Sequence, residues 1–178
     1  MTRHVLARDI VPACGEQTPQ VMRRAAHVLE LAASQRLAIA TAESCTGGLI
    51  ASMLTDVEGL GRWFDRGFVT YSVEAKVEML GIEPMLLRRH DPVSETIAHA
   101  MAHGALARSR AGVAIAVTGN AGEAGRHDEA GLAYIAVVTR DGRAITRECH
   151  YGPRGRDAIR LELVGAAFAM ATTLLGNA

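Results

Sequence analysis

Apolar residues in the first part of the chain alternate between helical spacing and short continuous runs. A helix is predicted from Thr18-Pro19 to about Arg36, because Thr is a favourable helix cap, Pro suits a first turn, and five apolar residues follow at helical spacing: Val21, Ala25, Val28, Leu29 and Ala32. The run at 37–40 predicts a buried strand, and 49–54 a short helix. Residues 1–17 show no clear period and are interpreted as a loose arm before one domain, residues 18–178.

The same alternation continues through the middle of the chain. Residues 67–71 predict a second strand, and a short helix begins near Ser72. Another short helix is expected over 85–90, and Ser94 is predicted to cap a longer helix over about 95–107. The nearly continuous apolar run at 112–117 is typical of a strand that is covered on both faces.

The last part of the chain predicts a hairpin and a closing helix. Two strand-like runs, 132–139 and 144–151, are joined by a turn that contains Asp141-Gly142, a strong hairpin signal. A helix over about 156–175 follows, with apolar residues on one stripe: Ile159, Leu163, Ala167, Met170 and Leu174. The predicted fold class is therefore α/β: three α/β/α layers around a mixed, mostly parallel sheet, with an antiparallel hairpin near the C-terminus.

Composition and charge narrow the classes of partner. The chain has 178 residues, of which 49% are hydrophobic and 21% charged, with 19 basic and 19 acidic side chains. This balance and the lack of a basic block argue against nucleic acid or an anionic membrane as the main partner. No uninterrupted apolar run approaches 18 residues, so neither a spanning helix nor a secretory signal is predicted.

Cysteine and histidine spacing predicts no metal site. The three cysteines, Cys14, Cys45 and Cys149, show no paired spacing, so a reducing cytoplasm is the expected compartment. His99 and His103 lie four residues apart on one helix face, but the further ligands of a metal motif are missing. We expect neither a metal nor a cofactor.

The stretch at 41–48, TAESCTGG, is the first candidate for chemistry. It lies between a predicted strand and a predicted helix, and it holds two hydroxyls, a thiol, a carboxylate and two glycines within six residues, 43–48. Free N–H groups at a helix start suit an anion or a developing oxyanion, and Gly47-Gly48 lets a ligand approach the backbone. Alternatively, Ser44 or Thr46 simply caps the helix.

One lysine stands out against the other basic residues. Eighteen of the 19 cations are Arg, and the single lysine is Lys76. A desolvated lysine can lose its proton near neutral pH, whereas arginine cannot. Lys76 is therefore a candidate for a proton-transfer role, although chance would also leave one lysine on a solvated helix face.

Two further groups carry possible ligand contacts. A second loop of hydroxyl and glycine, 118–122, follows the strand at 112–117, and ligands in open α/β sheets gather at the carboxyl ends of strands. Its glycines do not form a dinucleotide-binding fingerprint. Arg154, Arg156 and Arg160 cluster at the start of the closing helix, where cations oppose the helix dipole, so either a phosphate or carboxylate ligand or a solvated basic turn explains them.

With these residues in view, the chain resembles the CinA C-terminal domain family, whose active members are nicotinamide-nucleotide amidohydrolases. The longest matching stretches are 41–48 and 63–76, and shorter ones are 80–81, 93–95, 116–119 and 156–160. The resemblance implies metal-free hydrolysis of nicotinamide mononucleotide to nicotinate mononucleotide and ammonia, as part of pyridine nucleotide salvage. It also makes a cytoplasmic homodimer with a small nucleotide substrate the expectation.

The resemblance assigns roles to individual residues. The family's catalytic serine and lysine fall on Ser44 and Lys76, with Tyr71 also tied to activity. The expected substrate-binding residues are Glu43, Thr46, Gly47, Gly48, Thr118, Gly119 and Arg156. A neutral, desolvated Lys76 would activate the Ser44 hydroxyl, and Cys45 is the weaker candidate for the nucleophile.

The chain departs from the family pattern in one loop. Residues 120–131 read NAGEAGRHDEAG, without the proline and lysine that the family usually carries there. This change leaves two alternatives open: a non-catalytic nucleotide-binding module that retains the pocket, and an amidase for a different substrate.

Overall fold

The computed structural model describes residues 18–122 and 129–176. The predicted arm at 1–17 and most of the predicted loop at 122–130 lie outside these residues. The elements follow the chain in this order: α1 Thr18–Ser34, β1 Ile39–Glu43, α2 Leu49–Thr55, a 3₁₀ turn η2 Gly61–Trp63, β2 Phe64–Val69, α3 Val73–Leu80, α4 Pro84–Arg89, α5 Glu95–Ala107, β3 Val113–Gly119, β4 Leu132–Thr139, β5 Ala144–His150 and α6 Arg156–Gly176.

The five strands form one mixed sheet in the order β2-β1-β3-β4-β5. Strand β1 pairs in parallel with both β2 and β3, whereas β4 pairs antiparallel with β3 and with β5. Among the described strands β4 alone therefore runs against the others. The predicted α/β class and the Asp141-Gly142 hairpin are confirmed.

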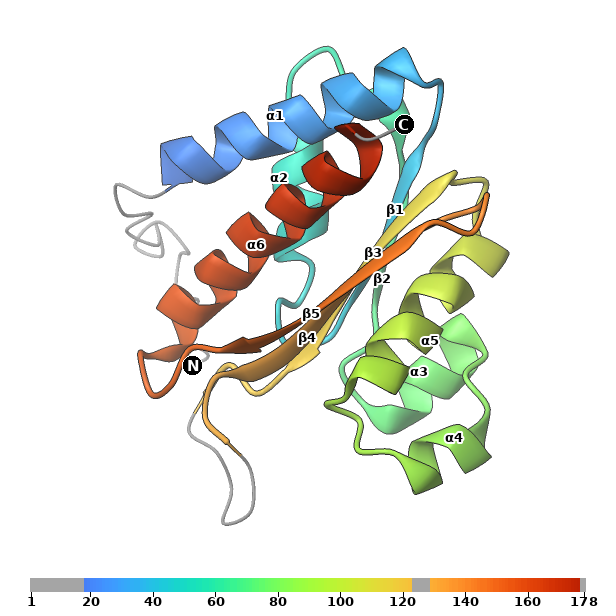
Figure 1. Ribbon diagram of the computed structural model, residues 1–178, viewed down its shortest axis with the longest axis vertical. Coiled ribbons are helices and arrows are strands. Elements are labelled where there is room, and N and C mark those ends of the chain that lie inside the picture. Colours follow the sequence, from blue (N-terminus) through green and yellow to red (C-terminus); the bar gives the residue numbers. More distant parts are fainter. Residues whose placement is uncertain (1–17, 123–128, 177–178) are drawn as a thin grey trace, which may run out of the picture.

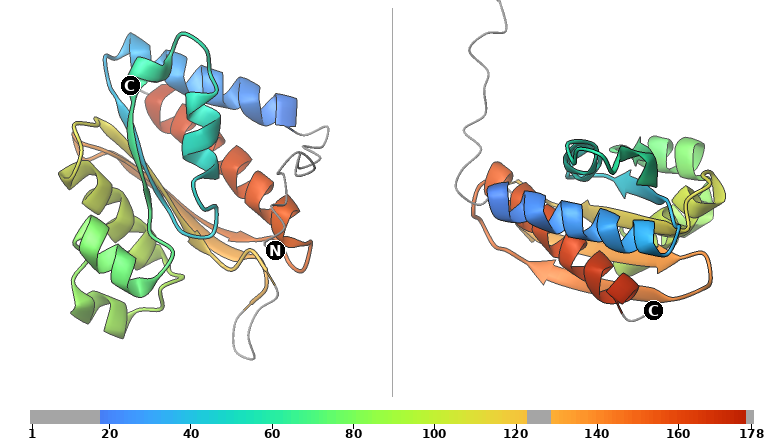
Figure 2. Two further views of the ribbon diagram at one scale, coloured as in Figure 1. Left: turned by 180° about the vertical axis from the view of Figure 1, so that it is seen from behind. Right: turned by 90° about the horizontal axis from the view of Figure 1, so that it is seen from above.

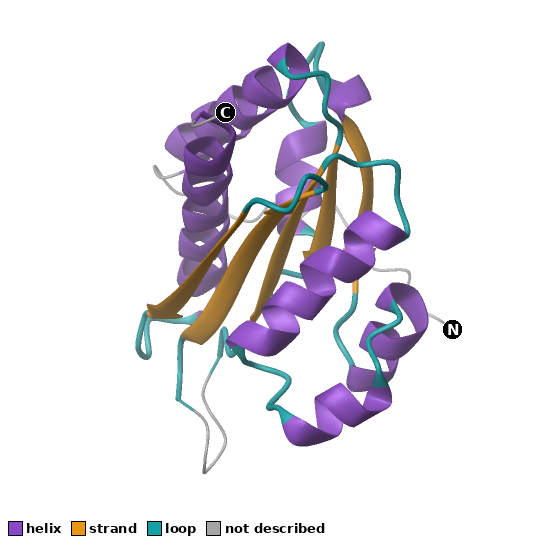
Figure 3. Ribbon diagram, turned by 45° about the vertical axis from the view of Figure 1, so that its right-hand side comes forward, coloured by secondary structure: helices purple, strands orange, loops and turns teal. Residues whose placement is uncertain are grey.

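Helices cover both faces of the sheet (Figures 1 and 3). Helices α1, α2 and α6 lie on one face, and α3, α4 and α5 on the other; the view from behind shows the same division (Figure 2). Helix α6 is long and apolar enough to cross a membrane by length and composition alone, but half of its most apolar window is buried in the molecule. Its packing on α1 and the sheet accounts for this apolar stripe.

The two faces of the sheet differ in side-chain size. Large residues such as Ile39, Ile115 and Ile135 face α1, α2 and α6, whereas the face toward α5 is lined by Ala40, Ala42, Ala114, Ala116 and Ala136. Because successive strand residues point to opposite faces, this division follows directly from the sequence. The small face lets α5 approach the sheet closely, and the large face fills the space beneath three helices.

The bounds of two strands differ most from the predicted ones. Strand β1 extends through Thr41 and Glu43, which are polar but fully buried, so the apolar run at 37–40 marks only its first half. Strand β2 begins at Phe64 rather than at residue 67, because Asp65 and Arg66 lie on an exposed edge strand where no apolar pattern is required. The predicted buried residues of α1 and the bounds of α5 agree with the structure.

Candidate active site

The candidate residues gather where three parallel strands end. Strand β1 ends at Glu43, β2 at Val69 and β3 at Gly119, and β1 lies between the other two. The carboxyl ends of these strands share one edge of the sheet, so the stretches that follow them, 44–48, 70–72 and 120–122, are neighbours. This is the edge at which α/β proteins bind ligands.

Glu43 and Ser44 leave the end of β1 toward opposite faces of the sheet. The Glu43 side chain turns toward α2, where its carboxylate accepts hydrogen bonds from the N–H groups of Gly48, Ile50 and Ala51 at 3.0, 3.0 and 2.9 Å. Ser44 points to the α3 side. The geometry therefore favours a structural role for Glu43 over the substrate contact expected from sequence: it closes the N-terminus of α2.

The helix-cap alternative for Ser44 and Thr46 is wrong. Residue Gly48 stands at the cap position of α2, with φ 93°, and no side chain at that position forms a cap hydrogen bond. The orphan N–H groups of the first turn are satisfied by Glu43 instead. The hydroxyls of Ser44 and Thr46 are thus free of that role. Thr46 Oγ1 is fully buried and has no hydrogen-bond partner among the described residues.

Ser44 meets the single lysine of the chain. The Lys76 Nζ atom lies 3.2 Å from Ser44 Oγ and donates a hydrogen bond to the Thr70 carbonyl oxygen at 2.9 Å. Lys76 stands in the second turn of α3, whose first turn is fixed by the Ser72 hydroxyl accepting from the Ala75 N–H. Sequence reasoning missed the Thr70 carbonyl oxygen, because every residue has a backbone carbonyl and no residue type marks this one.

Burial controls the charge of this lysine. Lys76 is 2% exposed, and in the described part of the chain its amine forms no ion pair with a carboxylate. Desolvation lowers the pKa of Lys76 from its ordinary value, with only a smaller opposing effect from Cys45. A neutral amine that donates to Thr70 keeps a lone pair for the Ser44 hydroxyl proton, which is the geometry a general base requires.

Cys45 is a poor competitor for the nucleophile. Its side chain is 5% exposed, and burial raises the pKa of the Cys45 thiol to about 11, although Arg156 and Arg160 act in the opposite direction. A thiolate is the reactive form of cysteine, so the thiol is inert at neutral pH. This supports the preference for Ser44.

Few backbone N–H groups in the loop remain free for an oxyanion. The N–H of Gly47 donates to the Ser44 carbonyl oxygen at 3.1 Å, and that of Gly48 donates to Glu43. Within the described residues, the N–H of Thr46 has no acceptor. Of the donors expected over Thr46–Gly48, the structure therefore leaves Thr46 available. Gly47 and Gly48 contribute their left-handed backbone, with φ 61° and 93°.

The end of β3 contributes Thr118 and Gly119. Thr118 is 1% exposed, and its hydroxyl donates to the Pro92 carbonyl oxygen at 2.8 Å. This bond ties the turn before α5 to the site edge. A Cβ on Gly119 would clash with the Cβ of Ala133, so the glycine is required by the approach of β4. Their expected substrate contacts remain predictions.

Tyr71 and Arg156 lie together at the open side of the site. Tyr71 is 63% exposed, and its hydroxyl oxygen stands 3.5 Å from Arg156 Nη2. Arg156 is exposed at the first residue of α6. A phenol and a guanidinium converging on solvent suit an anionic ligand group. The residues at 18–122 and 129–176 contain no group of His, Cys, Asp or Glu that could hold a metal ion.

Comparison with known proteins identifies the family of the chain. Residues 22–175 match the family described as the CinA C-terminal domain. The chain is 44% identical over 137 residues to "Nicotinamide-nucleotide amidohydrolase PncC" of Escherichia coli K12, covering 75% of this chain and 81% of that protein. It is 48% identical over 130 residues to a "CinA-like protein" of Akkermansia muciniphila, covering 72% of this chain and 31% of that longer protein.

Solved structures give the same result. The competence/damage inducible protein CihA from Agrobacterium tumefaciens superposes with a TM-score of 0.83 at 43% identity, covering 86% of this chain and 94% of that one. A CinA superfamily protein from Klebsiella pneumoniae also superposes with a TM-score of 0.83, at 30% identity, covering 89% of this chain and 99% of that chain. The chain belongs to the CinA C-terminal domain family.

Proposed function

We propose that this protein hydrolyses the carboxamide of nicotinamide mononucleotide, giving nicotinate mononucleotide and ammonia, with Ser44 as nucleophile and Lys76 as base. The observation that carries the proposal is the buried 3.2 Å contact between Ser44 Oγ and Lys76 Nζ. The substrate is suggested by the printed name of the E. coli relative. Placement in pyridine nucleotide salvage, in the cytoplasm and as a homodimer, remains a prediction that accompanies this function.

The first half of the reaction forms an ester on Ser44. Neutral Lys76 takes the hydroxyl proton while Ser44 Oγ attacks the carboxamide carbon, and the carbonyl oxygen becomes an oxyanion. The protonated Lys76 then gives its proton to the departing nitrogen, the C–N bond breaks, and ammonia leaves. The Thr70 carbonyl keeps the amine in position throughout, because it accepts a hydrogen bond from Nζ in either protonation state.

The second half releases the acid. A water molecule loses a proton to the regenerated neutral Lys76 and attacks the ester carbonyl. Lys76 returns the proton to Ser44 Oγ as the ester bond breaks. In both halves the N–H of Thr46, which has no acceptor among the described residues, is a loop donor available to the oxyanion, and one such donor contributes about 3–4 kcal/mol in known hydrolases.

Arg156 and Tyr71 are proposed to hold the nucleotide phosphate. Their side chains converge at the open side of the site, and a guanidinium binds phosphate through paired hydrogen bonds. A Cβ on Gly122 would lie 3.5 Å from Arg156 Nη1, so the start of the altered 120–131 loop borders this guanidinium. That position is the reason to keep a different amide substrate as the second candidate.

Ammonia release from purified protein with nicotinamide mononucleotide tests the proposal, with Ser44→Ala as the control. We expect release from the natural protein and none above background from the variant. Ligand that raises the melting temperature but is recovered intact would replace the proposal with a non-catalytic binding module. Ammonia released from other amides, but not from the nucleotide, would establish the amidase with a different substrate.

A further inference from the structure

Two arginines of one cluster have different surroundings. Arg156 is exposed beside Tyr71, whereas Arg160, one turn later in α6, reaches under the catalytic loop. Arg160 Nη2 donates to the Thr46 carbonyl oxygen at 2.8 Å, a bond between residues 114 positions apart. The sequence grouped these side chains as one candidate anion site, but the structure divides them.

The position of Arg160 is costly for the fold. Its Nε atom is fully buried and has no hydrogen-bond partner among the described residues. A buried donor without an acceptor destabilises the native state, because it loses its hydrogen bonds to water and gains none in return. In exchange for this cost, the buried position of Arg160 allows its hydrogen bond to the Thr46 carbonyl oxygen.

Thr46 is the loop residue whose backbone carbonyl oxygen contacts Arg160. Its carbonyl oxygen accepts from both Arg160 Nη2 and the Leu49 N–H, the latter at 3.2 Å, while its own N–H has no acceptor in the described part of the chain. A Cβ on Gly47 would lie 3.6 Å from Arg160 Nη2, so the guanidinium lies directly against this turn. Fixing the Thr46 carbonyl restrains the rotation of the residue that carries the free N–H.

We propose that Arg160 is a positioning residue that holds the Thr46 backbone so that its N–H can stabilise the oxyanion formed at Ser44. This inference rests on the proposed function, since it concerns the same serine. Arg160 acts through Thr46 and its partly buried charge lies beneath the loop, whereas Arg156 meets the ligand from the solvent side. The two arginines should therefore affect different kinetic constants.

The test compares Arg160→Met and Arg160→Lys with Arg156→Met as the matched control. Met approximates the length of the arginine stem without its donors, and Lys restores one donor and the charge. We expect Arg160→Met to lower kcat about 10- to 100-fold, less than the loss of a direct oxyanion donor, with KM within about twofold. Arg160→Lys should recover part of kcat, and Arg156→Met should mainly raise KM.

A second readout avoids dependence on the nucleotide. A fluorophosphonate probe reacts at an activated serine and places its oxygen where the oxyanion would form, so its rate of labelling at Ser44, followed by intact mass, reports the same loop. We expect Arg160→Met to slow this labelling, and a control variant at an exposed arginine of α4, Arg89→Met, to keep the natural rate. Melting curves establish that each variant is folded, and Arg160→Lys replaces Arg160→Met if the latter unfolds.

The outcomes separate this inference from the proposed function. Natural protein that is labelled but releases no ammonia from the nucleotide would reject the substrate, while slower labelling of the Arg160 variants would still support the positioning role. Natural protein that is active, with Arg160 variants of unchanged kcat and labelling rate, would overturn the inference alone. A raised KM with unchanged kcat would also overturn it, because Arg160 would then bind substrate directly. Natural protein that shows neither reaction overturns both.

Discussion

Glu43 and Lys76 are both almost fully buried at one end of the sheet, yet their surroundings are opposite. The Glu43 carboxylate accepts three backbone N–H groups at the start of α2, which together replace much of the hydration it loses. The Lys76 amine has one carbonyl and one hydroxyl, and in the described residues it has no ionic partner. One group is held as part of the scaffold, and the other is left ready to exchange a proton.

The difference shows how one strand end serves both structure and chemistry. Consecutive residues of a strand point to opposite faces, so Glu43 meets α2 while Ser44 meets Lys76 from α3. The fixed carboxylate holds the helix start and hence the loop at 44–48. The desolvated amine then works on a serine whose backbone is held in place.

The largest effect is expected from removing the base. Lys76→Met should lower kcat/KM about 10²- to 10⁴-fold, because the Ser44 hydroxyl then has no group to accept its proton. Lys76→Arg should fail equally, since arginine keeps the charge but cannot act as a base. Ammonia release measures this loss, and circular dichroism verifies the fold. Substantial activity in Lys76→Arg would contradict the Ser-Lys mechanism.

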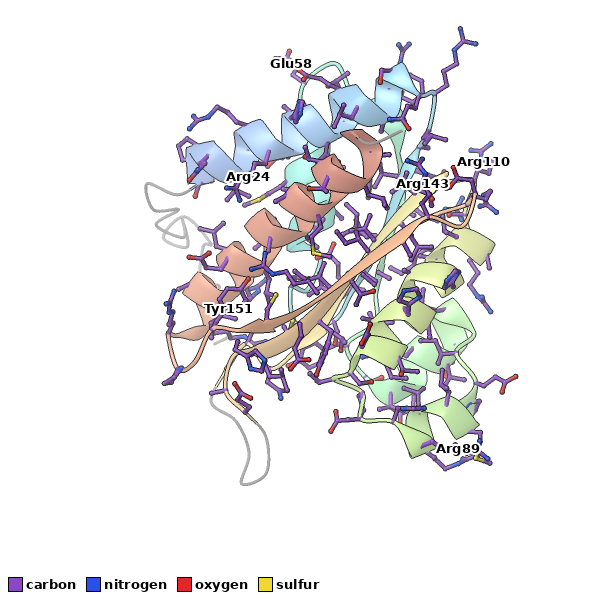
Figure 4. All side chains as sticks on the ribbon, in the orientation of Figure 1. Arg24, Glu58, Arg89, Arg110, Arg143 and Tyr151 are labelled. Atoms are coloured by element: carbon purple, nitrogen blue, oxygen red, sulfur yellow. The ribbon has the colours of Figure 1, made fainter. Side chains whose placement is uncertain are left out.

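A smaller effect, on stability, is expected from altering the scaffold carboxylate. Glu43→Gln replaces one acceptor oxygen by an amide donor, which leaves at least one of the three buried or partly buried N–H groups without a partner. We expect a loss of about 1–3 kcal/mol in the free energy of unfolding, measured by urea denaturation. Glu58→Gln, on the exposed loop after α2 (Figure 4), is the control and should change stability little. If Glu43→Gln and Glu58→Gln had the same free energy of unfolding, Glu43 would not have the structural role described here.

Removing the buried amine should stabilise the fold even as it abolishes activity. Because burial lowers the pKa of Lys76 in the folded state, the unfolded chain binds more protons between the folded and unfolded pKa values. Stability of the natural protein therefore rises with pH through that window, and the cost of the buried charge is full below it. Lys76→Met should raise Tm at neutral pH, by about 2–4 °C for each kcal/mol relieved, and the gain should shrink as pH rises.

Arg89→Met provides the control for this stability change. Arg89 is an exposed cation on α4 (Figure 4), so its removal relieves no burial. Calorimetry of both variants across pH separates the two cases. A Tm of Lys76→Met that is no higher than that of the natural protein at any pH would show that Lys76 carries no desolvation cost.

The smallest effect is expected at Cys45. With the pKa of its thiol raised to about 11, Cys45 contributes no thiolate at neutral pH. Cys45→Ala should keep kcat/KM within about threefold of the natural value, apart from a modest loss of packing. Ammonia release measures this, with Ser44→Ala assayed in parallel. Loss of activity in Cys45→Ala, with activity retained in Ser44→Ala, would show that the Cys45 thiol is the nucleophile.

Much of the fold could be read from the sequence because its signals are local. The helical period in α1, the Asp141-Gly142 turn and the Ser94 cap each depend on a few neighbouring residues, and each agrees with the structure. The full length of β1 could not be read, because Thr41 and Glu43 are polar. Helix α2 packs over Thr41, and its backbone N–H groups donate to Glu43. Both residues are therefore buried by tertiary packing, which the local sequence does not reveal.

The chemistry of the site was only partly readable for the same reason. The loop at 41–48 and the single lysine were visible as unusual residues, but their contact joins positions 32 apart. The arginines at the start of α6 could not be distinguished in the sequence. In the fold Arg156 is exposed to solvent, whereas Arg160 donates a hydrogen bond to the Thr46 carbonyl oxygen. The residue type limits the chemistry that a side chain can perform, and its tertiary contacts determine which role it has in the folded protein.

The Ser-Lys mechanism depends above all on the protonation state of Lys76, which can be measured by itself. Because Lys76 is the only lysine of the chain, protein grown with lysine labelled with ¹³C at Cε gives one side-chain signal, and its pH titration needs no substrate. We predict a midpoint clearly below the ordinary lysine pKa of 10.5, rising toward it when Ser44 and Lys76 are exposed by unfolding. A folded-state midpoint at or above that value would rule out the Ser-Lys mechanism, since Lys76 would then be charged at neutral pH and could not accept the proton of Ser44.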